Sequence, residues 1–492
     1  MLALLLVSSF AAWNVSTWGV KLRYPGEENL AEGIPLTEVI HLRQGVHIYD
    51  PPTADRFDAA NYGPLYYLLG TRLVNPARPD SLRLRLASLL ATLGCAACCG
   101  LLAFWLAGNG FAAALAALIF LAYRVTTFYG ASVRSDLGSL FLSLAGFLVA
   151  YHFRHSRKLL WATPILLAGF FYKQQFVAAP AGITLFLALD KRYRLALEFA
   201  ALLAVGGLAG LALFQFVIFR GQAFLQHFLL YNALPFSLDR LTSGLLFFAA
   251  LCLLPSLIGI EFLRLHRNRL LTCYVGFALP LSILMFGRQG SDANYFLECI
   301  ALLGCLFAAL VAERIGDGWR AAELLVLLAL SLILGQFFAL PPPTRADVTR
   351  DSAIQDFLRR HFPAHTRALG YYSGDLIRAG LDTPISNLYH HAWLVRRGVL
   401  PALALAAQIE DRRFGVVVVN FDLNHAPAAA WSDYYLTPRE RQAILSSYQP
   451  ATVLDLPEPE KFRPEDRFYV WIPRPAVDDS QSKGVHDGSR PE

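Results

Sequence analysis

The sequence predicts an all-α polytopic membrane bundle of about eleven transmembrane helices, followed by a small α/β soluble domain at the C-terminal end. Two observations carry this prediction. Of the 492 residues, 55% are hydrophobic and 16% are charged, whereas a soluble domain carries about 25% charge. The apolar residues are gathered in long runs, and these runs stop near residue 340. A single soluble core cannot absorb such an excess, because soluble chains divide into domains beyond about 250–300 residues.

The apolar runs predict where the transmembrane helices lie. Several are shorter than the ~20 residues of a straight crossing. The first run has no basic residues before it and no clear cleavage site, so we expect a retained helix and not a removed signal peptide. The expected spans are 1–20, 83–107, 110–130, 134–153, 157–172, 175–190, 194–219, 243–265, 268–287, 293–313 and 318–340.

The charges of the loops set the orientation. The most basic short loops are 154–158, 191–194 and 264–269, and the positive-inside rule assigns them to the cytoplasm. A long first loop (21–82), a second loop (220–242) and everything after residue 340 are then outside. We therefore expect a multi-pass membrane protein whose C-terminal part is extracytoplasmic. The net charge of +6 is spread over short loops, which favours membrane lipid over nucleic acid as a partner.

The first outer loop is too long to be a plain connector. Residues 29–43 and 62–74, and residues 222–238 of the second loop, carry apolar residues at helical spacing. Such segments are typical of amphipathic helices that lie at a membrane surface. Amphipathic loops above a bundle suit a cavity shared between lipid and water.

The chain divides into three parts by composition. Residues 1–340 form the membrane domain, 345–475 an extracytoplasmic α/β domain, and 476–492 a polar tail expected to be disordered. In the second part we expect helices at 352–360 and 401–409 and buried strands at 368–372 and 415–421. The seven cysteines all fall in apolar runs, so they are interpreted as helix-packing residues and not as a metal or disulfide site.

Ionisable and amide side chains gather at the outer ends of the expected spans, where the positive-inside rule gives no reason for cations. Each has an ordinary structural explanation, such as an interfacial ion pair or a lysine that snorkels to the interface. Together they favour a functional site, because charges in or beside spans cost a few kcal/mol each. The set is Glu27, Glu28, Arg134, Asp136, Lys173, Gln174, Gln175, Arg288, Asp292, Asn294 and Glu298.

Such a set suits group transfer from a lipid-linked phosphate. The reaction needs a carboxylate that takes the proton of an acceptor hydroxyl, and cations or a metal that stabilise the departing phosphate. Glu27 or Glu28 could be the base, while Arg134, Lys173 and Arg288 could hold the phosphate.

The two adjacent acids cannot face one site equally. Neighbouring residues on a helix diverge by about 100°, so Glu27 and Glu28 point in different directions. Glu28 and Glu32 share a face better.

Several short motifs carry a family resemblance. They are the acidic motif at 24–29, the tyrosine-bearing segments at 45–49 and 62–67, Arg134-Ser135-Asp136, Lys173-Gln174-Gln175 and residues 290–295. In layout the membrane half resembles the GT-C glycosyltransferases, and within them the bacterial enzymes related to the protein O-mannosyltransferases and the aminoarabinose transferases. Each motif is short and degenerate.

The resemblance implies transfer of a sugar, with inversion, from a polyprenyl-phosphate donor to a glycan, lipid or protein acceptor at the outer face. It makes the acidic residue of the first loop the base, and Asp136 a second catalytic carboxylate. A divalent cation, Mg²⁺ or Mn²⁺, held by Glu27 and Asp136 is the implied cofactor. The implied substrate-binding residues are Tyr62, Arg134, Lys173, Gln174, Arg288, Asp292, Asn294, Tyr295 and Glu298.

One departure from the family pattern leaves the base open. The common motif begins with Asp, whereas this chain has Gly26-Glu27-Glu28. The position in the motif favours Glu27.

Two other classes of function remain as alternatives. A transporter or flippase for a polar lipid would also use charges within a bundle, but such proteins often carry internal repeats and midplane sites, and here the charges lie at one face. A structural assembly protein would use the C-terminal domain to recruit partners. Covalent product formation separates the enzyme from both.

Overall fold

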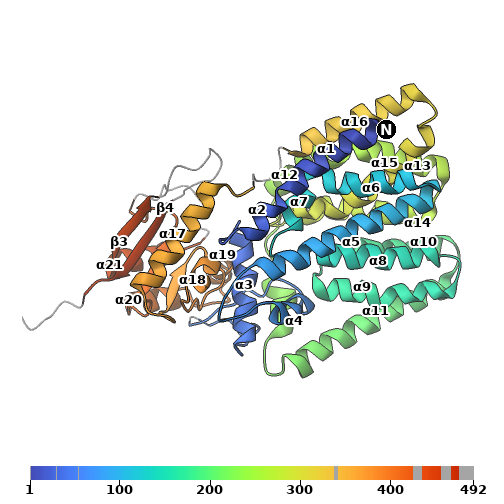
Figure 1. The fold of residues 1–492 in the computed structure, drawn as a ribbon. Helices are drawn as coiled ribbons and strands as arrows, with labels where there is room; N and C mark the ends of the chain where they lie inside the picture. The colour runs from blue at the N-terminus through green and yellow to red at the C-terminus, as the bar shows by residue number, and fades with distance from the viewer. Residues whose placement is uncertain are drawn as a thin grey trace, which may run out of the picture. The chain divides into compact units, whose positions relative to one another are not determined.

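The computed structural model describes residues 2–28, 30–53, 55–336, 342–424, 435–455 and 467–475. By contacts the chain divides into two compact units, Met1–Pro51 with Phe57–Ala353 and Pro52–Arg56 with Ile354–Glu492. The first unit is helical, and the second holds a small mixed sheet (Figure 1). A mostly helical protein with a separate small sheet is the expected fold class.

Every range expected to span the membrane contains helix. The helices of the first unit are α1 Leu2–Ser16, α2 Trp18–Arg23, α3 Leu30–Arg43, α4 Pro64–Leu73, α5 Leu82–Ala107, α6 Gly110–Ala122, α7 Arg124–Gly130, α8 Asp136–His152, α9 Ala162–Tyr172, α10 Ala178–Leu189, α11 Tyr193–Leu213, α12 Leu238–Phe248, α13 Leu254–His266, α14 Arg269–Phe286, α15 Leu297–Arg314 and α16 Gly318–Gln336. Five short 3₁₀ or π turns extend or join them: η1 Arg157–Trp161, η2 Phe214–Ile218, η3 Gln226–Tyr231, η4 Ala249–Leu253 and η5 Ala293–Phe296.

Six helical segments are long and apolar enough to cross a membrane, or seven if the bent pair α6–α7 is one span, within the residues that the structure describes. Helices α8 and α10 are apolar but shorter. The protein is therefore an integral multi-pass membrane protein, while the full count of eleven spans stays a prediction. The six are Leu82–Ala107, Tyr193–Ile218, Leu238–His266, Arg269–Phe286, Ala293–Arg314 and Gly318–Gln336.

The span expected over 110–130 consists of two helices with a break between them. The chain bends by 73° between α6 and α7, where Tyr123 adopts an extended backbone. The break frees the carbonyl of Ala122, which accepts hydrogen bonds from Asn14 Nδ2 at 2.6 Å and Gln336 Nε2 at 3.3 Å. Neighbouring helices thus satisfy the freed backbone group, as a break inside a bundle requires.

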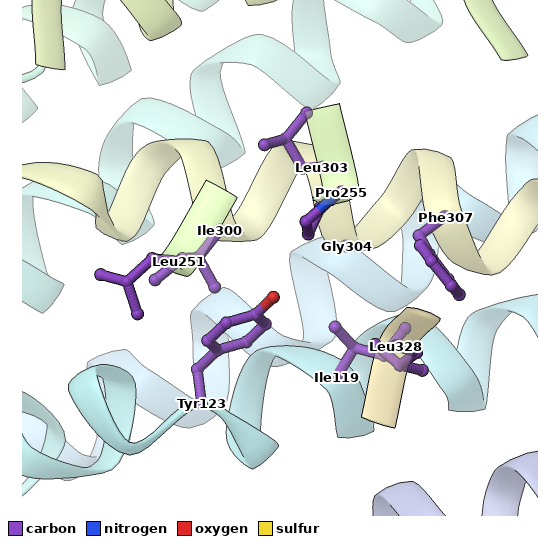
Figure 2. A pocket seen from close by; sticks show the side chains of 9 residues that line it. All are labelled: Ile119, Tyr123, Leu251, Pro255, Ile300, Leu303, Gly304, Phe307 and Leu328. Atoms are coloured by element: carbon purple, nitrogen blue, oxygen red, sulfur yellow. The ribbon is translucent and has the colours of Figure 1, made fainter. Parts of the chain in front are cut away.

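Helix α15 lies at the centre of the first unit. It packs against α5, α6 and α13, and 94% of its apolar window is buried. Figure 2 shows the seam where Ile300 and Phe307 of α15 meet Tyr123 and Leu328. The seam is apolar and leaves no room for a water molecule, so it is packing and not a ligand site.

Helix α3 differs from the expected surface helix. Its residues 32–41 are all buried, including Glu32, Glu38 and His41. The amphipathic pattern at 29–43 arises because its polar side chains have buried partners: Glu32 pairs with Arg85, and His41 pairs with Asp58 at 2.8 Å. Buried charges must be paired, so these acids and bases form ion pairs in the interior of the first loop.

The second unit is a four-stranded sheet with helices. Strands β1 Ala368–Gly370 and β2 Val416–Val419 are parallel, and β4 Arg467–Pro473 pairs antiparallel with β2 and with β3 Tyr448–Asp455, in the order β1-β2-β4-β3. Its helices are α17 Arg345–His361, whose first part belongs to the first unit, α18 Ser373–Arg378, α19 Leu388–Arg396, α20 Ala404–Glu410 and α21 Pro438–Ser447. The four valines of β2 are all buried. The helices and strands expected here are confirmed, whereas the tail 476–492 is outside the described residues.

Candidate active site

Asp136 is the centre of a polar cluster at the start of α8. Its side chain is buried, and its Oδ1 atom lies 2.5 Å from both Lys173 Nζ and Asn294 Nδ2. Lys173 follows α9, and Asn294 lies in η5, so three distant segments meet at one carboxylate. Asp136 Oδ2 is also buried and has no hydrogen-bond partner among the described residues.

Lys173 is a largely buried cation with other cations nearby. Burial lowers the pKa of Lys173, the Asp136 carboxylate opposes that shift, and Arg134 and Arg288 lower the pKa further. Its Nζ atom lies 5.5 Å from the centre of the Tyr62 ring. Burial also raises the pKa of the Tyr62 hydroxyl, so this ring stays neutral beside the cations.

Arg134 is held by aromatic and acidic neighbours. Its guanidinium lies 4.9 Å from the centre of the Tyr129 ring, and the Tyr129 hydroxyl donates a hydrogen bond to Asp292 Oδ2 at 2.5 Å. Arg134 also interacts electrostatically with Asp136 and Asp292. Arg134 and Arg288 are only partly buried, so they can meet a ligand.

The second outer loop lies beside this cluster. Gln174 Nε2 donates to the carbonyl of Phe228 at 3.2 Å, and Arg288 donates to the carbonyl of Asn232. Gln175 Nε2 donates to the carbonyl of Asn294 at 3.5 Å, while Tyr295 interacts electrostatically with Arg288, Asp136 and Arg134.

The two outer loops are also joined to each other. Tyr49 donates its N–H to Gln222 Oε1 at 3.2 Å, and Ala223 donates its N–H to the carbonyl of Tyr49 at 2.7 Å. The Tyr49 ring packs edge-on against Phe224, with 5.1 Å between the ring centres. The tyrosine of the 45–49 segment therefore links the loops that border the polar cluster.

The acidic motif of the first loop forms a second polar cluster. Glu28 Oε1 pairs with Lys21 Nζ at 2.7 Å, and Lys21 also donates to the carbonyl of Phe128 at 3.0 Å. Burial raises the pKa of Glu28, and Lys21 offsets part of that shift. A buried ion pair thus fixes the position of the Glu28 side chain.

Glu32 and Arg85 fix the backbone of this motif. Arg85 donates to both carboxylate oxygens of Glu32, at 3.1 and 2.7 Å, and to the carbonyls of Lys21, Tyr24 and Gly26. Burial alone would raise the pKa of Glu32, but Arg85 and two backbone N–H groups outweigh it and lower the pKa to about 2. The Glu28 N–H also donates to Glu32 Oε2 at 2.9 Å.

Glu32 connects the first cluster to the second. Its Oε1 atom accepts a hydrogen bond of 2.7 Å from the N–H of Val133, directly before Arg134. Glu27 is buried and lies against Gly33 of α3, where an added Cβ atom would be 2.0 Å from Glu27 Oε2. The acidic motif and the Arg134–Asp136 segment are therefore neighbours, although no described contact joins Glu27 directly to Asp136.

Eight of the site residues expected from the sequence come together around Asp136, whereas the three glutamates Glu27, Glu28 and Glu298 lie elsewhere. The polar cluster contains Tyr62, Arg134, Asp136, Lys173, Arg288, Asp292, Asn294 and Tyr295. Glu298 instead accepts a hydrogen bond from the Tyr274 hydroxyl at 2.7 Å within the bundle. No described contact joins it to Asp136.

Sequence reasoning missed Arg85. It is fully buried near the start of α5. A cation inside an apolar run is by default a functional or structural hypothesis, and that signal could have found it.

The cluster around Asp136 holds one of the two expected metal ligands, Asp136, but not Glu27. Within the described parts of the chain, no three His, Cys, Asp or Glu side chains come together in a way that could hold a metal ion. Asp136, one of the two expected ligands, already faces the ammonium of Lys173. The positive charge at this carboxylate comes from the chain itself.

Comparisons with known proteins point to one fold. No protein-family model and no curated protein sequence matches this chain. The crystal structure of ArnT from Cupriavidus metallidurans bound to undecaprenyl phosphate matches with a TM-score of 0.59 at 14% identity, over 94% of this chain and 97% of that chain. Its apo form gives a TM-score of 0.58 at 13% identity, over the same shares.

A second solved protein has the same architecture. The apo oligosaccharyltransferase from Archaeoglobus fulgidus matches with a TM-score of 0.52 at 13% identity, over 86% of this chain and 70% of that chain. Both neighbours are GT-C glycosyltransferases. The resemblance expected from the motifs is therefore confirmed at the level of architecture, and this chain has the GT-C fold.

Proposed function

We propose that the protein is a membrane glycosyltransferase. It moves a sugar from a polyprenyl-phosphate donor to an acceptor hydroxyl at the outer face of the membrane, with inversion. The observation that carries the proposal is the set of three neighbouring cations, Arg134, Lys173 and Arg288, around the buried Asp136. ArnT, which shares the fold, binds undecaprenyl phosphate.

The cations suit the leaving group. When the bond between the anomeric carbon and the phosphate oxygen breaks, the electron pair stays on the polyprenyl phosphate and its negative charge increases. Preformed cations stabilise that charge, more strongly in a site that excludes water. Asp136 holds Lys173 and Asn294 in position through its Oδ1 atom.

A carboxylate of the first loop takes the acceptor proton. The acceptor oxygen then attacks the anomeric carbon from the side opposite the phosphate, which inverts the configuration in one displacement. The position in the acidic motif favours Glu27 as the base, and Glu28 forms a buried ion pair with Lys21. Lys173 supplies a positive charge at Asp136.

The outer face is the face that carries these clusters. Residues 52–56 of the first outer loop belong to the same compact unit as the C-terminal sheet, and Asp55 pairs with Arg413 at 3.4 Å. This supports an extracytoplasmic domain over 345–475 in a protein of the bacterial inner membrane.

The test is a transfer assay on the purified full-length protein. Polyprenyl-phosphate sugars carrying a radioactive label are offered together with extracted envelope glycans, lipids and proteins. We expect wild-type protein to form a labelled product, Glu27→Gln to lower the rate by about 10²-fold or more, and Glu28→Gln to act mainly on stability.

The matched control is Glu198→Gln, which removes a carboxylate of an ion pair on α11 far from the acidic motif. It should transfer at the wild-type rate. Wild-type transfer by Glu27→Gln together with Glu28→Gln would eliminate the proposed base. Movement of the labelled donor across vesicles without any covalent product would instead identify a flippase.

A further inference from the structure

A cavity opens at the other end of the bundle from the candidate active site. Its volume is about 490 Å³, and its walls come from the C-terminal ends of α5, α8, α10 and α13 and the start of α14. Asp136 begins α8, and Arg154, which lines the cavity, follows 18 residues later. At 1.5 Å per helical residue this is about 27 Å, close to the ~30 Å thickness of the hydrocarbon core. The cavity and the active site therefore belong to opposite membrane faces.

The rim of the cavity is basic. Arg154, Arg267 and Arg269 line it, and Asp190 is the carboxylate among its lining residues. Arg269 approaches Asp190 only at 4.0 Å, with side chains that are 67% and 35% exposed. Exposed pairs of this kind contribute little, so the rim keeps a net positive charge.

Arg154 is held in place without being neutralised. Its Nη1 atom donates to the carbonyl of Tyr151 at 2.9 Å, and its guanidinium lies 4.6 Å from the centre of the Tyr151 ring. The same tyrosine hydroxyl accepts a hydrogen bond of 2.9 Å from Asn268 Nδ2. A cation fixed by a ring and a carbonyl still has donors for an anion.

Aromatic side chains form part of the wall beside the rim. Trp105 stacks on Tyr151 with nearly parallel rings whose centres are 6.0 Å apart, and Phe186 and Phe262 also contribute to the lining. Aromatic side chains next to a cationic rim fit an amphiphile with a negative headgroup better than a free ion. Basic pockets between transmembrane helices on the cytoplasmic side are known to take anionic lipid headgroups.

We propose that this cavity binds the phosphate headgroup of an anionic phospholipid from the leaflet at the basic end of the bundle. The phosphate lies among Arg154, Arg267 and Arg269, and the upper acyl chain lies along Trp105 and Phe186. Positive-inside charge alone accounts for basic loops, but it does not require a lined cavity or an oriented arginine. The site is separate from the proposed transfer reaction.

The test is native mass spectrometry of the full-length protein in detergent, titrated with phosphatidylglycerol or phosphatidylcholine. We expect one phosphatidylglycerol to be retained in preference to phosphatidylcholine. Arg154→Gln together with Arg269→Gln should weaken this retention roughly tenfold or more, since each basic residue near a lipid surface contributes about 1 kcal/mol. Asp190→Asn should strengthen it.

The matched control is Arg157→Gln together with Arg194→Gln, which removes the same charge from basic loops outside the cavity lining. Retention within twofold of wild type in this control supports the cavity. An equal loss in both double variants would assign the effect to bulk charge and overturn the proposal. Displacement of the lipid by an equal concentration of glycerol phosphate would also overturn it, in favour of a free phosphate.

If the Arg154 and Arg269 variant does not insert, Asp190→Asn decides alone. Its carboxylate borders the rim, and its removal takes no positive charge from any loop. Stronger retention of phosphatidylglycerol by this variant supports the proposal, and unchanged or weaker retention overturns it.

Discussion

The Oδ1 atom of Asp136 lies 2.5 Å from the Nζ atom of Lys173, although 37 residues separate them in the chain. The Asp136 side chain is fully buried, and that of Lys173 is 13% exposed. Such a pair is costly to desolvate, so its presence at the end of a bundle needs a reason beyond stability. Binding of a phosphate is such a reason, because it requires cations and Lys173 is held beside Arg134 and Arg288.

The first prediction separates the structural and chemical roles of this pair. Lys173→Met leaves the Asp136 carboxylate buried without its main partner, and should destabilise the protein by about 3–5 kcal/mol. Combining it with Asp136→Asn removes the orphaned charge and should restore most of the stability. Transfer should stay at least 10²-fold below wild type in both, because the phosphate has lost a cation. Thermal unfolding in detergent and the transfer assay measure the two effects.

The control for this prediction is an exposed ion pair. Arg157 and Glu198 are 3.1 Å apart with side chains 73% and 26% exposed, and breaking this pair should cost under about 1 kcal/mol. Recovery of activity along with stability in the Asp136→Asn, Lys173→Met protein would show that Lys173 is only structural.

Much of this architecture could be predicted from the sequence because lipid imposes simple rules. Long apolar runs give the helices, and every expected span contains one. The positive-inside rule did not explain the polar residues expected at the outer face. Four of them lie together in the structure: Arg134, Asp136, Lys173 and Asn294. Because a charge costs free energy in a membrane protein, its position in the sequence already indicates where a site is expected.

Other features depended on contacts that periodicity cannot reveal. The bend after Ala122 has no proline to announce it, and it is stabilised by Asn14 and Gln336 from distant helices. The amphipathic pattern of α3 looked like a surface helix because the partner of Glu32, Arg85, lies 53 residues away. The buried ion pair of Glu28 likewise depends on Lys21, a residue outside the motif.

The second prediction concerns acid stability. The folded-state pKa of Glu32 is lowered from 4.5 to about 2, so its ionised form stabilises the fold above pH 4.5. This contribution should disappear as the pH falls from about 4.5 to about 2. The double variant Glu32→Gln, Arg85→Gln has no titrating acid at this position. The difference in melting temperature between wild type and this variant should therefore shrink over that range.

The Arg157→Gln, Glu198→Gln protein serves as the comparison for this pH series, since it loses an exposed pair. Its melting temperature should follow that of the wild type at every pH. A wild-type advantage over the Glu32 and Arg85 variant that stays constant down to pH 2 would contradict the assigned ion pair.

The third prediction uses Gly33 to move Glu27 without mutating it. An added Cβ atom at Gly33 would lie 2.0 Å from Glu27 Oε2, so Gly33→Ala must displace the Glu27 carboxylate. The helix itself gains, because Ala is favoured over Gly by about 1 kcal/mol. We expect transfer to fall at least tenfold while the melting temperature changes little.

Two further variants complete this experiment. Gly19→Ala in α2, where an added Cβ atom meets nothing within 4 Å, should keep wild-type activity. Adding Gly33→Ala to Glu27→Gln should cause no further loss, because both changes act on the same carboxylate. A further tenfold loss would mean that Gly33→Ala acts elsewhere.

The last prediction concerns Gly63, between Tyr62 and the start of α4. Its φ of −69° suits any residue, but an added Cβ atom would lie 2.1 Å from the backbone carbonyl oxygen of Phe171. The Gly63 N–H also donates to the carbonyl of Tyr172 at 3.1 Å, one residue before Lys173. Gly63→Ala should therefore push the first loop away from the end of α9. We expect the stability to fall by about 2 kcal/mol or more and the transfer rate to fall as well.

Gly276→Ala in α14, where an added Cβ atom meets nothing within 4 Å, should behave as wild type. Wild-type stability and transfer in Gly63→Ala would show that the loop does not hold Lys173 in place.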